Sequence, residues 1–178
     1  MRIAASDGRQ FFSALLIPMT TGVALALSAV YFGPRGPLVA LLVNGFLMSQ
    51  VAGVGRVVEI TMPAGYFRLR GFERPLFYER LGIRPFKALM CSRLYRIINP
   101  DFRLEGGRIG LEELTQGMRS AEAAHAVLFV TVTAVSGVAL LLRWFDAAAW
   151  LMLINILSNG YPVMLQRYNR LRAERLLR

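Results

Sequence analysis

The chain has few residues of the kinds that bind metals or form cross-links. Among its 178 residues there is one cysteine, Cys91, and one histidine, His125. A single cysteine excludes an intrachain disulfide and any multi-cysteine metal site, and a single histidine argues further against zinc. Lysine is equally scarce, with Lys87 as the only one. We therefore expect no metal and no tightly bound cofactor.

Acidic residues are also scarce relative to basic ones. Eleven Asp and Glu residues stand against 21 Lys and Arg residues, which leaves a net charge of +10. At the same time 55% of the chain is hydrophobic and the mean hydropathy is +0.45. This combination is typical of a membrane protein with basic cytoplasmic parts. The apolar runs favour anionic lipid headgroups or phosphorylated cofactors as partners over nucleic acid.

Four apolar runs are long enough to cross a membrane. They lie at about residues 11–32, 37–60, 123–142 and 147–165. A helix of about 20 residues, with a rise of ~1.5 Å per residue, crosses the hydrocarbon core of a bilayer. We therefore predict an all-α integral membrane protein, organised as a single membrane domain (residues 1–178) with four transmembrane helices.

A basic segment, residues 62–122, separates the second run from the third. It contains 11 basic residues interleaved with aromatic ones, and no apolar window of spanning length. This pattern predicts short amphipathic helices on the membrane surface. After Gly110 the pattern changes and predicts a helix that continues without a break into the third run.

The basic residues beside the runs predict the orientation of the chain. Eleven lie in the basic segment, five follow the fourth run, and two precede the first, whereas each short connector has only one. The positive-inside rule therefore places both termini and the basic segment in the cytoplasm.

The only histidine stands at the start of the third run, three residues after Glu122. On a helix the two side chains share one face. A carboxylate beside an imidazole can fix its tautomer and raise its basicity, as a general base requires. Two interpretations are open: His125 is a general base oriented by Glu122, or it is an interfacial histidine without chemistry. Glu59, which either pairs with Arg56 at the membrane edge or shares a pocket with His125, is a further candidate.

Amide side chains interrupt the fourth run and the tail that follows it. Asn155, Asn159, Gln166 and Asn169 recur at spacings of four, seven and three residues, which is one face of an α-helix. Such residues either hold helices together or line a polar cavity. Pro162 lies on the same face, and we expect it to kink the helix.

Three blocks of the sequence resemble a known family, the bacterial glycosyl-4,4'-diaponeurosporenoate acyltransferases. The similarity extends from about residue 72 to residue 175, and its tail block is the most specific. The blocks are Phe72-Glu73 with Tyr78-Glu-Arg-Leu-Gly-Ile83 and Lys87, then Glu122-Ala-Ala-His125, then Asn159-Gly-Tyr-Pro162 with Gln166-Arg-Tyr-Asn-Arg170 and Arg172.

The resemblance implies a small enzyme of the bacterial cytoplasmic (inner) membrane. Its expected activity is to esterify a fatty acyl chain onto a hydroxyl of a glycosylated carotenoid or another glycolipid. An acyl thioester, such as an acyl-CoA, would be the donor, with its phosphates held by arginines of the basic segment. Asn159 or Gln166 would hydrogen-bond the developing oxyanion. The pocket residues implied by the resemblance are Glu122, His125, Gln166, Arg167, Asn169 and Arg170.

Other functions stay open on the sequence alone. The chain is also compatible with a non-catalytic membrane adaptor, or with a lipid-binding subunit of a larger complex. Cys91 offers a covalent variant of the enzyme, in which the acyl group passes first to its thiolate. A homodimer is compatible with so small a chain, but the sequence identifies no interface.

Overall fold

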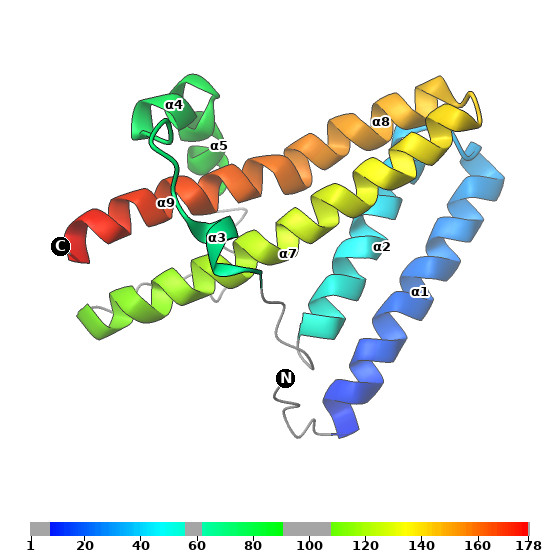
Figure 1. Cartoon of the computed structure of the whole chain (residues 1–178). Helices are drawn as coiled ribbons and strands as arrows, with labels where there is room; N and C mark the ends of the chain where they lie inside the picture. Colours follow the sequence, from blue (N-terminus) through cyan, green and yellow to red (C-terminus); the bar gives the residue numbers. More distant parts are fainter. Residues whose placement is uncertain (1–7, 56–61, 91–107, 178) are drawn as a thin grey trace. The chain divides into compact units, whose positions relative to one another are not determined.

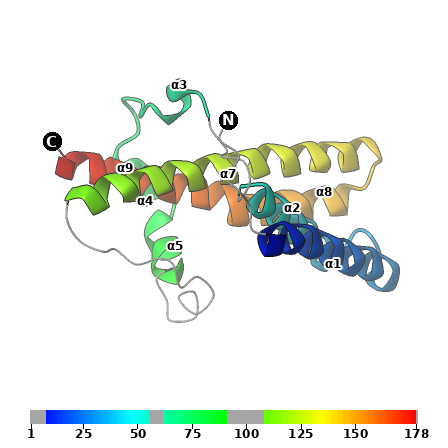
Figure 2. The same ribbon diagram turned by 90° about the horizontal axis from the view of Figure 1, so that it is seen from below.

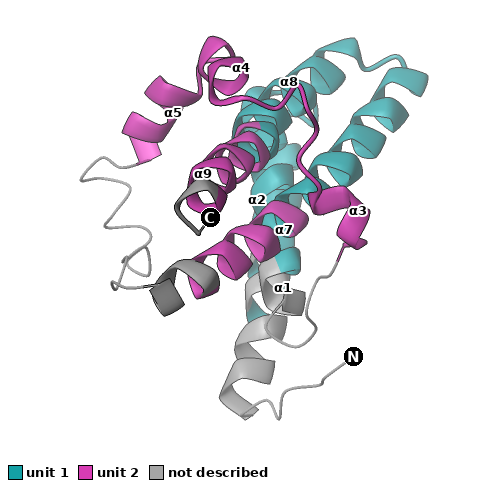
Figure 3. Ribbon diagram, turned by 60° about the vertical axis from the view of Figure 1, so that its left-hand side comes forward, with its two compact units in different colours: residues 1–61, 124–160 teal, residues 62–123, 161–178 magenta. Residues whose placement is uncertain are grey.

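The computed structural model describes residues 8–55, 62–90 and 108–177, and every regular element in these ranges is helical. The predicted all-helical class is confirmed for this part of the chain. Two compact units can be distinguished (Figure 3). Unit 1 comprises residues 1–61 and 124–160, and unit 2 comprises residues 62–123 and 161–178.

Unit 1 begins with two apolar helices that lie side by side (Figures 1 and 2). Helix α1 spans Gly8–Phe32 and helix α2 spans Pro37–Gly55. Between them Gly33 has a φ of +80°, a left-handed conformation that glycine adopts without steric cost. Over their described residues, 11–32 and 37–55, the first two predicted runs are therefore helices joined by a tight connector.

The rest of unit 1 is formed by the second part of α7 and by α8. Helix α7 runs from Arg108 to Leu141 without a break, as the sequence predicts, and its residues from 124 onward belong to unit 1. A tight turn leads to α8, Phe145–Asn155, and contains Arg143 at a φ of 60°. Small side chains let the helices approach closely. The apolar core consists of Ala40, Val132, Ala139, Ala147, Ala148 and Leu151.

A short π-helix lies shortly before Pro162, where the sequence predicts a kink. Helix α8 leads into η1, Ile156–Gly160, and α9 follows at Tyr161–Leu177. Proline has no N–H to donate to the carbonyl of Ser158, and its ring clashes with that carbonyl in a regular α-helix. The wider turn of η1 ends two residues before the proline and includes Ser158, which relieves this conflict.

Two helical stretches are long and apolar enough to cross a membrane. They are Glu113–Leu141 and Phe145–Glu174, and only 22% and 28% of their apolar windows are buried. Large side chains such as Val130 and Leu141 are exposed instead. Apolar surface of this kind suits contact with lipid. The apolar stretches described in α1 and α2 are shorter, so the four-span topology stays a prediction.

Unit 2 contains short helices packed against α9. They are α3 (Ala64–Phe67), α4 (Pro75–Arg80) and α5 (Ile83–Met90), and they lie where the sequence predicts short helices. Gly82, at a φ of +80°, forms the turn between α4 and α5. The core of unit 2 consists of Tyr78, Ile83, Leu165, Tyr168 and Leu171.

Candidate functional site

The predicted catalytic histidine meets one of the predicted amides in unit 1. His125 of α7 and Asn159 of η1 lie with Nδ1 and Oδ1 3.2 Å apart. Asn159 is 2% exposed, whereas His125 is only partly buried. The histidine therefore has a fixed partner on one side of its ring and remains accessible.

Two further amides hold Asn159 in place. Its Nδ2 donates to Oδ1 of Asn155 at 2.8 Å and to Oδ1 of Asn44 at 3.2 Å. Asn44 donates in turn to the carbonyl of Ala40 at 3.0 Å, and Asn155 donates to the carbonyl of Phe129 at 2.9 Å. These bonds form a closed network among apolar helices, so Asn155 and Asn159 hold elements of unit 1 together instead of facing an open cavity.

The network determines which nitrogen of His125 carries the proton. Backbone carbonyls only accept, so the amide nitrogens of Asn44 and Asn155 face Ala40 and Phe129, and their oxygens face Asn159. The nitrogen of Asn159 must donate to those oxygens, which leaves its own oxygen for the histidine. Neutral His125 is therefore protonated at Nδ1, and Nε2 keeps a lone pair. This is the tautomer that a general base needs.

The π-helix brings Asn159 to this position. Single π turns inside helices occur frequently at functional sites. A Cβ at Gly160 would lie 3.3 Å from the ring of Phe129, so the backbone of η1 approaches α7 about as closely as glycine allows. This close approach places the amide within hydrogen-bonding distance of His125.

Glu122 has partners of its own in unit 2. Its carboxylate accepts a hydrogen bond from Nε of Arg167 at 2.8 Å and another from Nε of Arg170 at 3.0 Å. Both Glu122 and Arg170 are 0% exposed. These two guanidinium groups are stronger partners for a carboxylate than a neutral imidazole. The described contacts therefore give Asn159, not Glu122, the position of the group that orients His125.

The same arginines extend the network to the segment around α3. Arg167 pairs with Oε1 of Glu73 at 2.6 Å and donates to the carbonyl of Tyr66 at 2.7 Å. Arg170 donates to the carbonyl of Phe67 at 3.1 Å. Through these contacts Arg167 and Arg170 connect α9 to α7 and to α3 within unit 2. The contacts are costly to break, because removing one partner of a buried ion pair leaves the other charge uncompensated.

The remaining predicted site residues are less closely connected. Asn169 accepts a hydrogen bond from Nζ of Lys87 at 3.1 Å. Gln166 is buried, and its amide oxygen has no hydrogen-bond partner in the described ranges. Glu59 and Cys91 lie outside the described residues. The predicted row of amides is thus divided, because its first two members belong to unit 1 and its last two to unit 2.

Three contributors were not selected from the sequence. Asn44 is a lone amide in an apolar run, which is itself a signal of buried hydrogen bonding. Glu73 lies in one of the blocks that resemble the family. Tyr78 lies close to Glu73, and burial raises the pKa of its phenol to about 12, so that it stays protonated at neutral pH.

These observations define an all-helical protein with a histidine–amide site among apolar helices. The chain belongs to the family described as CrtO, glycosyl-4,4'-diaponeurosporenoate acyltransferase, whose model matches residues 63–178. The resemblance noted for residues 72–175 is thereby confirmed and extended. The family makes the chain a membrane-associated acyltransferase in the broad sense. Comparisons with curated proteins and with solved structures gave no match.

Proposed function

We propose that the protein transfers a fatty acyl group from an acyl thioester to a hydroxyl of a glycosylated carotenoid or another glycolipid. His125 is the general base in this proposal. The observation that carries it is the hydrogen bond between Nδ1 of His125 and Oδ1 of Asn159, because this bond favours a lone pair at Nε2.

The reaction proceeds by direct attack of the acceptor. Nε2 of His125 takes the proton of the hydroxyl while the hydroxyl oxygen bonds to the thioester carbonyl carbon. The tetrahedral oxyanion then collapses, the carbon–sulfur bond breaks, and the leaving thiolate takes the proton from Nε2. The products are an ester and a free thiol, and the histidine returns to its neutral form.

Asn159 acts as a positioning residue in this scheme. Its amide nitrogen already donates to Asn155 and Asn44, so it is a poor donor for the oxyanion. Glu122 contributes through the fold of unit 2, where it neutralises Arg167 and Arg170.

We place the enzyme in the bacterial cytoplasmic membrane, with four spans and both termini in the cytoplasm. The largely unburied apolar stretches of α7 and α8 support a membrane location. In this arrangement a lipid-linked acceptor comes from the bilayer and the acyl donor from the cytoplasm.

The test is mass spectrometry of the lipids and pigments of the native host, with and without the gene. Wild type, His125→Ala and Thr131→Ala are then returned to the deletion strain. Thr131 is an exposed residue of the same helix, and its hydroxyl bonds only to the carbonyl of Val127 among the described residues, so it is a matched control.

We expect an acylated glycoside to disappear on deletion and to return with wild type and Thr131→Ala. Loss of a general base typically lowers the rate by about 10²–10⁴-fold, so His125→Ala should restore almost none of it. A well-expressed His125→Ala variant that restores the product overturns this function. Such a result would favour the non-catalytic adaptor or lipid-binding subunit.

A further inference from the structure

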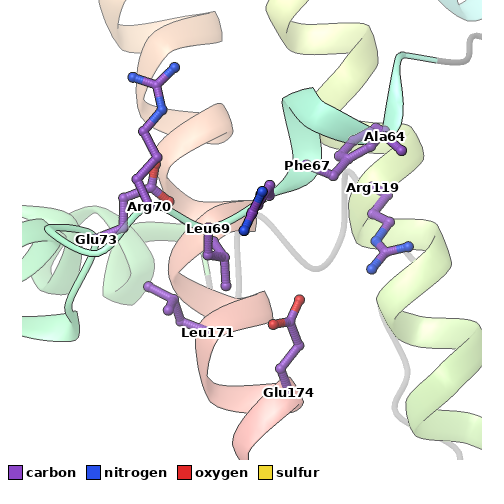
Figure 4. Close-up of a pocket in the computed structure, with 9 residues that line it drawn as sticks. Ala64, Phe67, Leu69, Arg70, Glu73, Arg119, Leu171 and Glu174 are labelled. Atoms are coloured by element: carbon purple, nitrogen blue, oxygen red, sulfur yellow. The ribbon is translucent and has the colours of Figure 1, made fainter.

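Unit 2 contains a cavity that the histidine site does not use (Figure 4). Its volume is about 560 Å³, which lies in the range of about 300–1,000 Å³ typical of pockets for small molecules. The walls come from α3 and the segment after it, from the first part of α7 and from α9. Its charged lining residues are Arg68, Arg70, Glu73, Arg119 and Glu174.

The cavity has an excess of positive charge that the described residues do not neutralise. Both of its carboxylates are already paired with arginines outside the lining: Glu73 with Arg167 at 2.6 Å, and Glu174 with Arg170 at 3.5 Å. Within the described ranges, no ion pair is formed by the three lining arginines, Arg68, Arg70 and Arg119. An anionic ligand would supply the missing charge.

Glu73 is held within the wall of the cavity. It is 6% exposed, its Oε1 pairs with Arg167, and the phenol of Tyr78 lies beside it. Its carboxylate is therefore already engaged by the protein. In Figure 4 Glu73 and Arg70 lie on one side of the cavity, while Arg119 of α7 and Glu174 of α9 lie on the other. Arginines therefore reach the cavity from both sides, and a ligand that fits carries negative charge.

We propose that this cavity binds the phosphate group of a small phosphorylated molecule. Arginine recognises phosphate through two parallel N–H···O bonds, and three arginines line the cavity. The nucleotide head of a coenzyme A thioester and the headgroup of phosphatidylglycerol both carry this chemistry. Assigning the cavity to the acyl donor rests on the proposed function, whereas phosphate binding by the cavity does not.

The experiment measures binding by the full-length protein in detergent micelles, without turnover. The two probes are coenzyme A lacking an acyl chain and short-chain phosphatidylglycerol, each titrated by calorimetry. The test variant is R68Q/R119Q. The control, R74Q/R80Q, removes the same charge from two exposed arginines that do not line the cavity. All four positions are exposed, so both variants should keep the wild-type fold, which circular dichroism checks.

We expect R68Q/R119Q to bind one probe at least about tenfold more weakly than wild type, since a hydrogen bond to a charged group typically contributes that much or more. R74Q/R80Q should bind like wild type. A selective loss of coenzyme A binding identifies the donor head as the ligand, and a selective loss of phosphatidylglycerol binding identifies a lipid headgroup. Equal binding of both probes by R68Q/R119Q and wild type overturns the proposal.

His125→Ala separates this proposal from the proposed function. The variant should bind the probe as wild type does and still fail to transfer acyl groups. An active His125→Ala enzyme would overturn the general-base mechanism and leave the cavity proposal intact. Unchanged binding by R68Q/R119Q would overturn the cavity proposal and leave the general-base mechanism intact.

Discussion

Glu122 and Arg170 form an ion pair in which both side chains are 0% exposed, with Oε2 and Nη2 2.9 Å apart. Such a pair is costly to break, because removing one member leaves the other charge buried without compensation. Arg167 shares the same carboxylate at 2.8 Å. The stability of unit 2 should therefore depend strongly on Glu122.

Glu122→Ala should lower the free energy of unfolding by about 3–5 kcal/mol, because two guanidinium groups lose the buried carboxylate that they share and keep only Glu73 and Glu174. The measurement is denaturant unfolding in detergent, followed by circular dichroism. Arg84→Ala is the control, since Arg84 pairs with Glu79 at the surface and its side chain is 71% exposed. This variant should unfold at nearly the wild-type midpoint, because exposed pairs are screened by water and salt. Equal midpoints for both variants would contradict the structural role of Glu122.

Asn159→Ala should lower kcat by up to about 10²-fold. This is the lower end of the range of about 10²–10⁴-fold that is typical for loss of a general base. The histidine then loses the acceptor that holds its proton on Nδ1, while substrate binding is preserved, so KM should change little. Steady-state kinetics with a glycolipid acceptor provides the measurement. Thr131→Ala is the control, because Thr131 lies on the helix of His125 and its hydroxyl donates, among the described residues, only to the carbonyl of Val127. Full kcat in Asn159→Ala would remove this residue from the mechanism.

Gly160→Ala should destabilise unit 1 by about 1–3 kcal/mol, the usual cost of overpacking. The added methyl group would lie 3.3 Å from the ring of Phe129 and push η1 away from α7. Gly137→Ala, in α7, is the matched control, because a methyl group added there would meet no neighbouring atom within 4 Å. This control should raise the free energy of unfolding by about 0.5–1 kcal/mol, because alanine has a higher helix propensity than glycine. The two thermal midpoints should therefore move in opposite directions, and a shared direction would contradict the close-packing argument.

Much of the helical architecture could be predicted from the sequence, because apolar runs and their flanking charges report local preferences. The unbroken helix from Arg108 to Leu141 is an example. The partners of individual side chains were harder to predict. Spacing alone placed Glu122 beside His125, but it carries no information on Arg167 and Arg170, which lie 45 and 48 residues further along the chain.

The row of amides shows the same limit. Spacings of four, seven and three residues define one face only if the helix keeps 3.6 residues per turn. The π-helix Ile156–Gly160 breaks that period between Asn155 and Gln166, so the register calculated from the sequence no longer holds beyond it. The sequence revealed which residue types mattered, whereas their grouping required the three-dimensional structure.

Unit 2 is built from two segments that are far apart in the sequence, and this affects the order in which it can form during translation. Its two parts, residues 62–123 and 161–178, are separated by residues of unit 1, so the ribosome completes α8 before it adds Arg167 and Arg170. Until then the nascent chain carries Glu122 without its counter-charges. A translation product that stops before α9 would keep an unneutralised carboxylate at a position that is fully buried in the complete protein. Cellular quality control should therefore degrade such fragments rather than let them accumulate.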